Sequence, residues 1–326
     1  MIFDFALEPE LVATWHDRSV AYPFLCQLGR GHRKVPCTFP AARWKSLVIE
    51  AFQASSPPQN SPAGQAARKA IEVLLRHLDE VSTRRNGRIA DAESWLTAAC
   101  NEHGEFPFGG ILVRNSGETH AALVCADRIG EVEFPAWNPA APPVLRTAIG
   151  LATALAPLLR SASQLRFVDP YFDAEDASFF EPMREYLARA QARRTVGDLR
   201  LQLHLAVRNS ELEKARRDGR NITESGLANE KLDACATHLL PLLQQGVSLH
   251  GFVWGRSQAG VEMHNRYVLS EVGGLAVQTG LDREIRNVPR TDDITVLSRE
   301  QHAARWLEYS PTGTLHRLVA ERDLRA

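Results

Sequence analysis

Residues 164–172 read QLRFVDPYF, a short apolar run that ends in Asp169 and Pro170. The run predicts a β-strand that leads into a loop at Asp169. Residues 177–194 then carry the pattern of a helix, and residues 199–207 alternate with the two-residue period of a strand. This alternation of strands and helices predicts an α/β domain with a mixed sheet flanked by helices.

The same alternation continues toward the C-terminus. A strongly apolar helix is expected over 144–162, before the quoted run, and a second helix over 224–245, with Gly246 as its stop. Further strands are expected at 247–254, 262–270 and 273–281, the last two joined by a turn at Val272, Gly273 and Gly274. A helix over 298–309 closes the pattern, with Ser298 and Gln301 in the positions of a capping box.

The first 140 residues show a different pattern of predicted helices and strands. Helices are predicted near 40–53, 66–85 and 90–102, and the segment 109–127 predicts two strands joined by a turn at 115–117. We therefore expect a mainly helical N-terminal region of unknown role over 1–140, with a small strand pair, and an α/β domain over 141–326. This region would bind a protein partner or complete the sheet of the following domain.

Composition limits the classes of function. The net charge of −1 excludes a basic field over the whole protein, so a nucleic-acid or lipid site must be a local patch. Five cysteines without a CxxC pair predict a reducing compartment. Cys26, His32 and Cys37 are too widely spaced for an ordinary zinc site, so no metal is expected. An acidic N-terminus without a basic segment, and no apolar run of about 18 residues, predict a cytoplasmic protein.

Polar residues gather around the stretch MHNRYVLSE at 263–271. On a strand, His264 and Arg266 would point to the same face, which Glu262 would share. Thr279 and Asp282 lie on the next strand and its exit, so pairing of the two strands would bring them close. Asp169, at the end of another strand, stands where α/β proteins usually place ligand-binding loops.

These residues resemble the phospholipase D superfamily. His264, Arg266 and Glu271 resemble its HxK(x)4D signature, with arginine in place of lysine and glutamate in place of aspartate, and residues 278–280 match the downstream Gly-Ser-x-Asn element only loosely. The closer resemblance is to the phospholipase D-like MIT C-terminal domain family, in DPYF at 169–172, the His-x-Arg pair, and Gly-Leu-Asp at 280–282. The similarity covers about residues 164–309.

The resemblance implies a metal-independent phosphodiesterase that needs no cofactor. His264 would attack phosphorus to form a phosphohistidine, and Arg266 would stabilise the phosphate charge. Glu271 would orient His264. Because the chain has one such motif, the resemblance implies a homodimer that supplies the second histidine. The substrate would be nucleic acid, in a prokaryotic defence system, with a membrane surface the less favoured partner. The alternative is a non-catalytic module that binds phosphate groups of nucleic acid or lipid as a recruitment or scaffold subunit.

Simpler interpretations stay open for each residue. His264 and Arg266 would also suit a half-buried strand with a satisfied polar face, and Asp169 would suit a turn before proline. Tyr171, expected here as a substrate contact, would suit the core. Arg256 would contact phosphate or solvent, and Glu262 would hold the imidazole or lie on the surface. The basic turn at 215–221 would follow a nucleic-acid backbone or be merely solvated.

Overall fold

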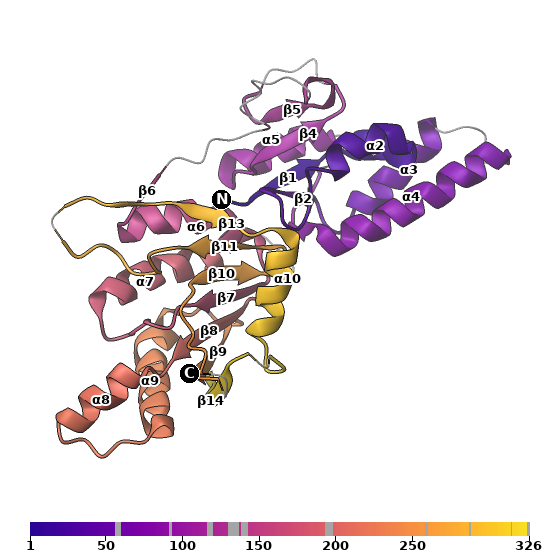
Figure 1. Ribbon diagram of the computed structural model, residues 1–326. Helices are drawn as coiled ribbons and strands as arrows, with labels where there is room; N and C mark the ends of the chain where they lie inside the picture. Colours follow the sequence, from indigo (N-terminus) through magenta and orange to yellow (C-terminus); the bar gives the residue numbers. More distant parts are fainter. Residues whose placement is uncertain are drawn as a thin grey trace. The chain divides into compact units, whose positions relative to one another are not determined.

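The computed structural model describes residues 1–55, 60–90, 93–115, 120–129, 137, 143–192, 198–257, 260–286, 288–313 and 315–324. The chain divides into two units, which are considered separately (Figure 1). The N-terminal unit contains Ile2–Ala141, and the C-terminal unit contains Pro142–Arg193 and Gly197–Ala326. The predicted boundary between residues 140 and 141 lies outside the described residues, as does most of the predicted turn at 115–117.

The N-terminal unit is built on a five-stranded sheet in the order β3-β2-β1-β4-β5, in which all pairs are parallel. Its strands are β1 (Phe3–Leu7), β2 (Lys34–Thr38), β3 (Thr83–Arg84), β4 (Gly110–Val113) and β5 (Leu123–Cys125). Its helices are α1 (Pro9–Ala13), α2 (Arg18–Leu25), α3 (Trp44–Ser55), α4 (Pro62–Val81) and α5 (Trp95–Glu105), with short 3-10 turns η1 (Thr14–His16) and η2 (Ala126–Arg128).

The region contains more helix than strand, as predicted, but its five-stranded sheet replaces the expected small strand pair. The predicted strand pair at 109–127 exists as β4 and β5, but the two strands run parallel, with Ile111 opposite Leu123, and do not form a hairpin. Strands β1, β2 and β3 were not predicted. They are two to five residues long, and β2 contains Pro36, so the local pattern that normally marks a strand is weak.

Side chains alternate between the two faces of β1 as the period of a strand requires. Phe5 and Leu7 pack into a core shared with residues of helices α1 to α4, whereas Ala6 packs into a second core with Trp95 of α5. The sheet therefore separates two apolar cores.

Asp4 of β1 is buried and holds Arg85 through two hydrogen bonds. Arg85 donates from Nε to Oδ2 at 2.8 Å and from Nη2 to Oδ1 at 3.1 Å. The guanidinium also lies 4.0 Å from the centre of the Phe108 ring. This bidentate pair is an ion pair that has been removed almost wholly from water.

The C-terminal unit is built on a seven-stranded mixed sheet in the order β13-β11-β10-β7-β8-β9-β14. Its strands are β7 (Gln164–Val168), β8 (Arg200–Ala206), β9 (Ser248–Gly255), β10 (Tyr267–Ser270), β11 (Gly273–Val277), β13 (Ile294–Val296) and β14 (Arg317–Leu324), and β6 (Val144–Leu145) pairs with β12 (Thr291–Asp292) beside it. Its helices are α6 (Ala148–Ser161), α7 (Ala177–Gln191), α8 (Asn209–Arg217), α9 (Glu224–Leu239) and α10 (Arg299–Glu308), with the 3-10 turn η3 (Leu240–Leu242).

Strands β7, β8 and β9 run parallel, and the remaining strands of this sheet join them antiparallel. Figure 1 shows α6, α7 and α9 on one face of the sheet and α10 on the other. Phe167 stacks on Tyr186 of α7, with ring centres 6.0 Å apart, while its neighbour Val168 packs into the core under α10. The predicted α/β class with a mixed sheet is therefore confirmed.

Local predictions in this unit are largely confirmed. The expected pair of strands at 262–281 is the antiparallel pair β10–β11, although Ser270 pairs with Gly273, so the turn is Glu271–Val272. The capping box of α10 is present, with the Ser298 and Gln301 side chains bonded to each other's backbone N–H. Strand β14 was not predicted. No helix in the described part of the chain is long and apolar enough to cross a lipid bilayer.

Candidate phosphate-binding site

Four polar side chains meet at one edge of the C-terminal sheet, around the ring of Tyr171. The Tyr171 hydroxyl lies 3.0 Å from Nδ1 of His264, and the two rings meet edge to face. The guanidinium carbons of Arg266 and Arg208 lie 4.5 Å and 4.6 Å from the centre of the Tyr171 ring. We call these four residues the Tyr171 cluster. His264 is exposed, and the other three are half-buried.

The register of the sheet explains why these residues meet. Strands β7 and β8 are parallel, with Val168 opposite His204, so the loops that follow them leave the sheet at the same edge. Tyr171 follows β7, and Arg208 follows β8. Strand β10 runs antiparallel to β7, with Tyr267 opposite Val168, so the residues just before β10 reach this edge too. Polar groups from three chain segments therefore converge at the carboxyl ends of the parallel strands.

His264 and Arg266 were expected on a strand, and this detail is wrong. Strand β10 begins at Tyr267, so both residues belong to the segment that leads into it. The two side chains nevertheless point toward the same place, because both contact the Tyr171 ring. Arg266 is further held by a hydrogen bond from Nη1 to the carbonyl oxygen of Gln278 at 3.2 Å.

Two guanidinium donors in the cluster lack a partner. The Nε–H groups of Arg208 and Arg266 are buried, and neither has a hydrogen-bond partner among the described residues. Arg208 uses another nitrogen, Nη2, to donate to Glu211 at 3.0 Å. Buried donors are nearly always satisfied in folded proteins. Two unsatisfied Nε–H groups, on two arginines that pack against the Tyr171 ring, therefore favour an anionic ligand beside this ring.

Asp169 supports the cluster and does not face it. Its side chain is 2% exposed and accepts from two backbone N–H groups, those of Tyr171 and Leu281, each at 2.9 Å. Burial is the largest influence on this carboxyl group and raises its pKa. Gly280 beside it has a φ of +118°, and a Cβ there would come within 2.5 Å of Asp282. Asp169 thus joins the DPYF and Gly-Leu-Asp segments by hydrogen bonds, as the turn interpretation of this residue required.

Thr279 and Asp282 belong to a separate network centred on the buried side chain of Arg146. Nη1 of Arg146 donates to Asp292 Oδ2 at 2.9 Å and to the Thr279 hydroxyl, and Nη2 lies 2.9 Å from Asp282 Oδ1. Thr279 in turn donates to Asp292. These side chains fix the 279–282 segment, so the structure does not support their predicted contact with substrate.

Arg256 and Glu262 pair with each other. Nη2 of Arg256 donates to Glu262 Oε1 at 2.5 Å, and both side chains are about half exposed, at 49% and 48%. Glu262 therefore does not hold the imidazole of His264, whose Nδ1 contacts Tyr171. The surface interpretation applies to this pair.

Glu271 does not join the cluster. It follows β10, whereas His264 precedes it, so the whole strand separates the two residues. Its carboxylate accepts from the Ser163 backbone N–H at 2.6 Å, the Ser163 hydroxyl at 2.8 Å and the Gln164 backbone N–H at 3.0 Å. The structure thus contradicts a catalytic role for Glu271, because its carboxylate fastens the start of β7.

Arg208 is the member of the cluster that sequence reasoning missed. A signal existed, because Arg208 follows a predicted strand at 199–207 as Tyr171 follows the predicted strand at 164–168. Two parallel strands that pair with each other place the residues that follow them at the same edge of the sheet. The sequence, however, does not show that β7 and β8 pair.

Within the described part of the chain, no three His, Cys, Asp or Glu side chains are placed to hold a metal ion. Cys37 is buried in β2, and Cys26 is exposed at the end of α2. Comparison with known proteins finds no matching family model, no matching curated protein and no matching solved structure. The resemblance to the phospholipase D superfamily therefore rests on the quoted residues alone.

Proposed function

We propose that the Tyr171 cluster binds a nucleic-acid phosphodiester and that the protein cleaves it as a metal-independent phosphodiesterase of the phospholipase D type. The observation that carries this proposal is an exposed imidazole, that of His264, next to two guanidinium groups with unused Nε–H donors. A histidine beside two fixed cations is the combination that a phosphoryl-transfer site needs.

The proposed chemistry assigns one step to each group. Nε2 of His264 attacks phosphorus, a nitrogen–phosphorus bond forms, and the bond to the leaving oxygen breaks. Arg208 and Arg266 stabilise the negative charge on the phosphoryl oxygens, and arginine can do so with two donors at once. The leaving oxygen takes a proton from the matching histidine of a second chain, and water then hydrolyses the phosphohistidine.

Nucleic acid is the favoured substrate class because more cations follow Arg208 along the chain. Arg208 is the residue that precedes α8, and the exposed side chains of Lys214, Arg216 and Arg217 lie in the last turn of that helix. A helix of nine residues is about 13 Å long, so cations stand at both ends of a path that could span two nucleotides.

The second candidate function is phosphate binding without cleavage. One observation favours it: Nδ1 of His264 contacts a tyrosine hydroxyl, where a nucleophilic histidine would gain more from a carboxylate. A phenol does not stabilise the imidazolium charge as a carboxylate does. In this case the cluster would hold anions for a recruitment or scaffold subunit.

One experiment separates the two candidates. Labelled single- and double-stranded DNA and RNA are incubated with the purified protein in EDTA, and the test is repeated with His264→Ala, Arg266→Ala and the matched control His32→Ala. Cleavage by wild type and His32→Ala that falls at least a thousandfold in His264→Ala supports the phosphodiesterase. Binding without cleavage, weakened by Arg266→Ala but not by His264→Ala, supports the second candidate. Failure to bind any of the four nucleic acids contradicts the phosphodiesterase and limits the second candidate to phosphate groups of lipid.

The dimer is tested on its own. Sedimentation of the active protein at micromolar concentration is expected to show two chains. Full activity of a monomer would contradict the proposed proton donor from a second chain.

A further inference from the structure

We propose that the groove between α2 and α4 of the N-terminal unit binds a small amphiphilic carboxylate, an unbranched alkyl chain that ends in one carboxylate group. This inference is independent of the phosphodiester site, because every residue of the groove belongs to the N-terminal unit.

The groove is long and mostly apolar. One wall is a stripe of α2 that includes Ala21 and Leu25, and the other is a stripe of α4 that includes Ala66, Ala70 and Val73. The cavity has a volume of about 540 Å³, within the range of small-molecule sites. Its lining on α4 runs from residue 66 to residue 77, which corresponds to about 16 Å along the helix axis. An elongated ligand fits such a space.

Helix α4 presents a second apolar stripe to this groove. Its core-facing side chains, such as Ile71, Leu75 and Leu78, are buried within the unit. A surface helix normally needs only that one stripe. Val73, however, lines the groove and remains 56% exposed, and Tyr22 on the opposite wall is 70% exposed. Apolar surface of this kind, gathered along one cavity, is typical of a binding site.

The positive charge of the side chains that line the groove favours an anionic ligand. The groove is lined by Arg18, Lys69 and two histidines, and no carboxylate is part of its lining. Arg18 and Lys69 have no ion-pair partner within the described ranges of the chain. The neighbouring Asp17 is already used, because its carboxylate accepts from the backbone N–H and the hydroxyl of Ser19.

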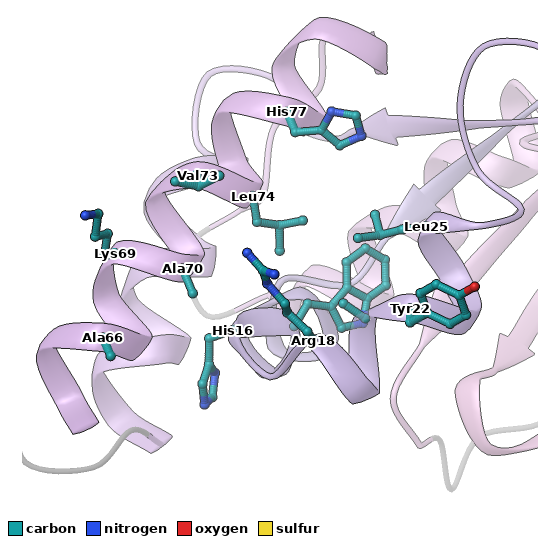
Figure 2. A pocket seen from close by; sticks show the side chains of 12 residues that line it. His16, Arg18, Tyr22, Leu25, Ala66, Lys69, Ala70, Val73, Leu74 and His77 are labelled. Atoms are coloured by element: carbon teal, nitrogen blue, oxygen red, sulfur yellow. The ribbon is translucent and has the colours of Figure 1, made fainter. Parts of the chain in front are cut away.

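Only one of these cations is aimed into the groove. Figure 2 shows the Arg18 guanidinium reaching across toward Leu74 of α4, whereas the Lys69 side chain points away from α2. Trp15 also lines the cavity, and its buried Nε1–H has no hydrogen-bond partner among the residues that the structure describes. One inward cation fits a single carboxylate, and the aliphatic walls fit the chain attached to it.

The test uses the full chain and calorimetric titration with dodecanoate, with uncharged dodecanol, and with an acidic amphipathic helical peptide, at concentrations that do not lower the unfolding temperature of the protein. We expect dodecanoate to bind at one site and dodecanol to bind at least tenfold more weakly. Arg18→Gln is expected to weaken dodecanoate about tenfold, since a charge-assisted hydrogen bond is lost, and to leave dodecanol unchanged. Ala70→Phe, which fills the groove, is expected to weaken both ligands.

The matched control is Arg68→Gln, which removes a cation from α4 outside the lining and should change neither affinity. Equal affinity for dodecanol, unchanged dodecanoate binding in Arg18→Gln, or no binding of dodecanoate would each overturn the proposal. Binding of the peptide without binding of dodecanoate would overturn it in favour of a helical partner protein.

Discussion

Each unit buries one arginine against aspartate, but only the C-terminal unit also gathers half-buried arginines around the ring of Tyr171. In the N-terminal unit, Arg85 is held by both oxygens of Asp4 within the core. In the C-terminal unit, Arg146 is neutralised in the same way by Asp292 and Asp282, yet Arg208 and Arg266 remain at the sheet edge with unused donors. The comparison separates cations that complete a fold from cations that are available to a ligand.

The difference also concerns the kind of opening that each unit offers. The N-terminal unit has an apolar groove between two helices, in which the inward cation is Arg18. The C-terminal unit has a polar cluster beyond the ends of parallel strands, where loops rather than helix faces carry the side chains. The two ligands that we propose, an aliphatic carboxylate and a phosphodiester, would therefore bind different units of one chain.

The largest effect is expected from Asp4→Ala. It leaves Arg85 buried without its main partner, so the free energy of unfolding of the N-terminal unit should fall by about 3–5 kcal/mol. Urea denaturation with hydrogen exchange of the β1 and β4 amides would measure this loss. Asp79→Ala, which removes a half-buried partner of the exposed side chains of Lys45 and Arg84, should cost less than about 1 kcal/mol. Equal losses in the two variants would show that burial does not set the difference.

Glu271→Ala tests whether this carboxylate stabilises the C-terminal unit or takes part in catalysis. The variant loses three accepted hydrogen bonds at the start of β7, so unfolding should become easier by about 1–3 kcal/mol. Cleavage per folded molecule should stay unchanged in the nuclease assay. A large loss of activity at unchanged stability would show that Glu271 has a catalytic role.

Lys34 gives the N-terminal unit a pH dependence of its own. Its ammonium lies 4.1 Å from the centre of the Trp137 ring, and burial lowers the pKa of Lys34 to about 8. In the unfolded chain the pKa is about 10.4, so the unfolded state binds more protons between these values. Stability should therefore rise with pH from about 8 to about 10.4.

The measurement is the free energy of unfolding of this unit at pH 7 and pH 10, in wild type and in Lys34→Met. The wild type should gain more on going to pH 10 than the variant does. Identical gains would show that Lys34 does not carry the effect.

The smallest effect is expected from Glu262→Gln. The variant breaks an exposed pair with Arg256, which should change stability by less than about 0.5 kcal/mol and leave cleavage unchanged. The affinity of Arg256→Gln for labelled single-stranded DNA checks whether Arg256 also lies outside the site. A tenfold loss there would place Arg256 on the phosphate backbone and sharpen the outline of the site.

Sequence reasoning succeeded where the information was local. Strand β7, strand β8 and the capping box at Ser298 each follow from a few neighbouring residues, and so does the antiparallel pair β10–β11. The resemblance to a known family assigned Tyr171 and His264 to one site, but the direct contact between them was not predicted. The turn role of Asp169 is also a local property, because its carboxylate accepts from the N–H two residues on.

What failed depended on distant partners. The N-terminal sheet joins strands as short as Thr83–Arg84, which become strands only because β2 lies beside them. Arg208 reaches Tyr171 only through the register of β7 with β8. Glu271 has the right spacing from His264, but spacing along a strand does not bring two residues together when the strand itself lies between them.

The sequence separation between β9 and its partner β14 has a consequence for synthesis on the ribosome. β14 (Arg317–Leu324) pairs with β9 (Ser248–Gly255) along its whole length, yet about sixty residues separate the two. Until β14 emerges, the outer edge of β9 is open, and its Phe252 and Trp254 lack part of their cover. An open edge of this kind can pair with other chains, so the nascent protein is prone to aggregation after β9 has emerged and before β14 has.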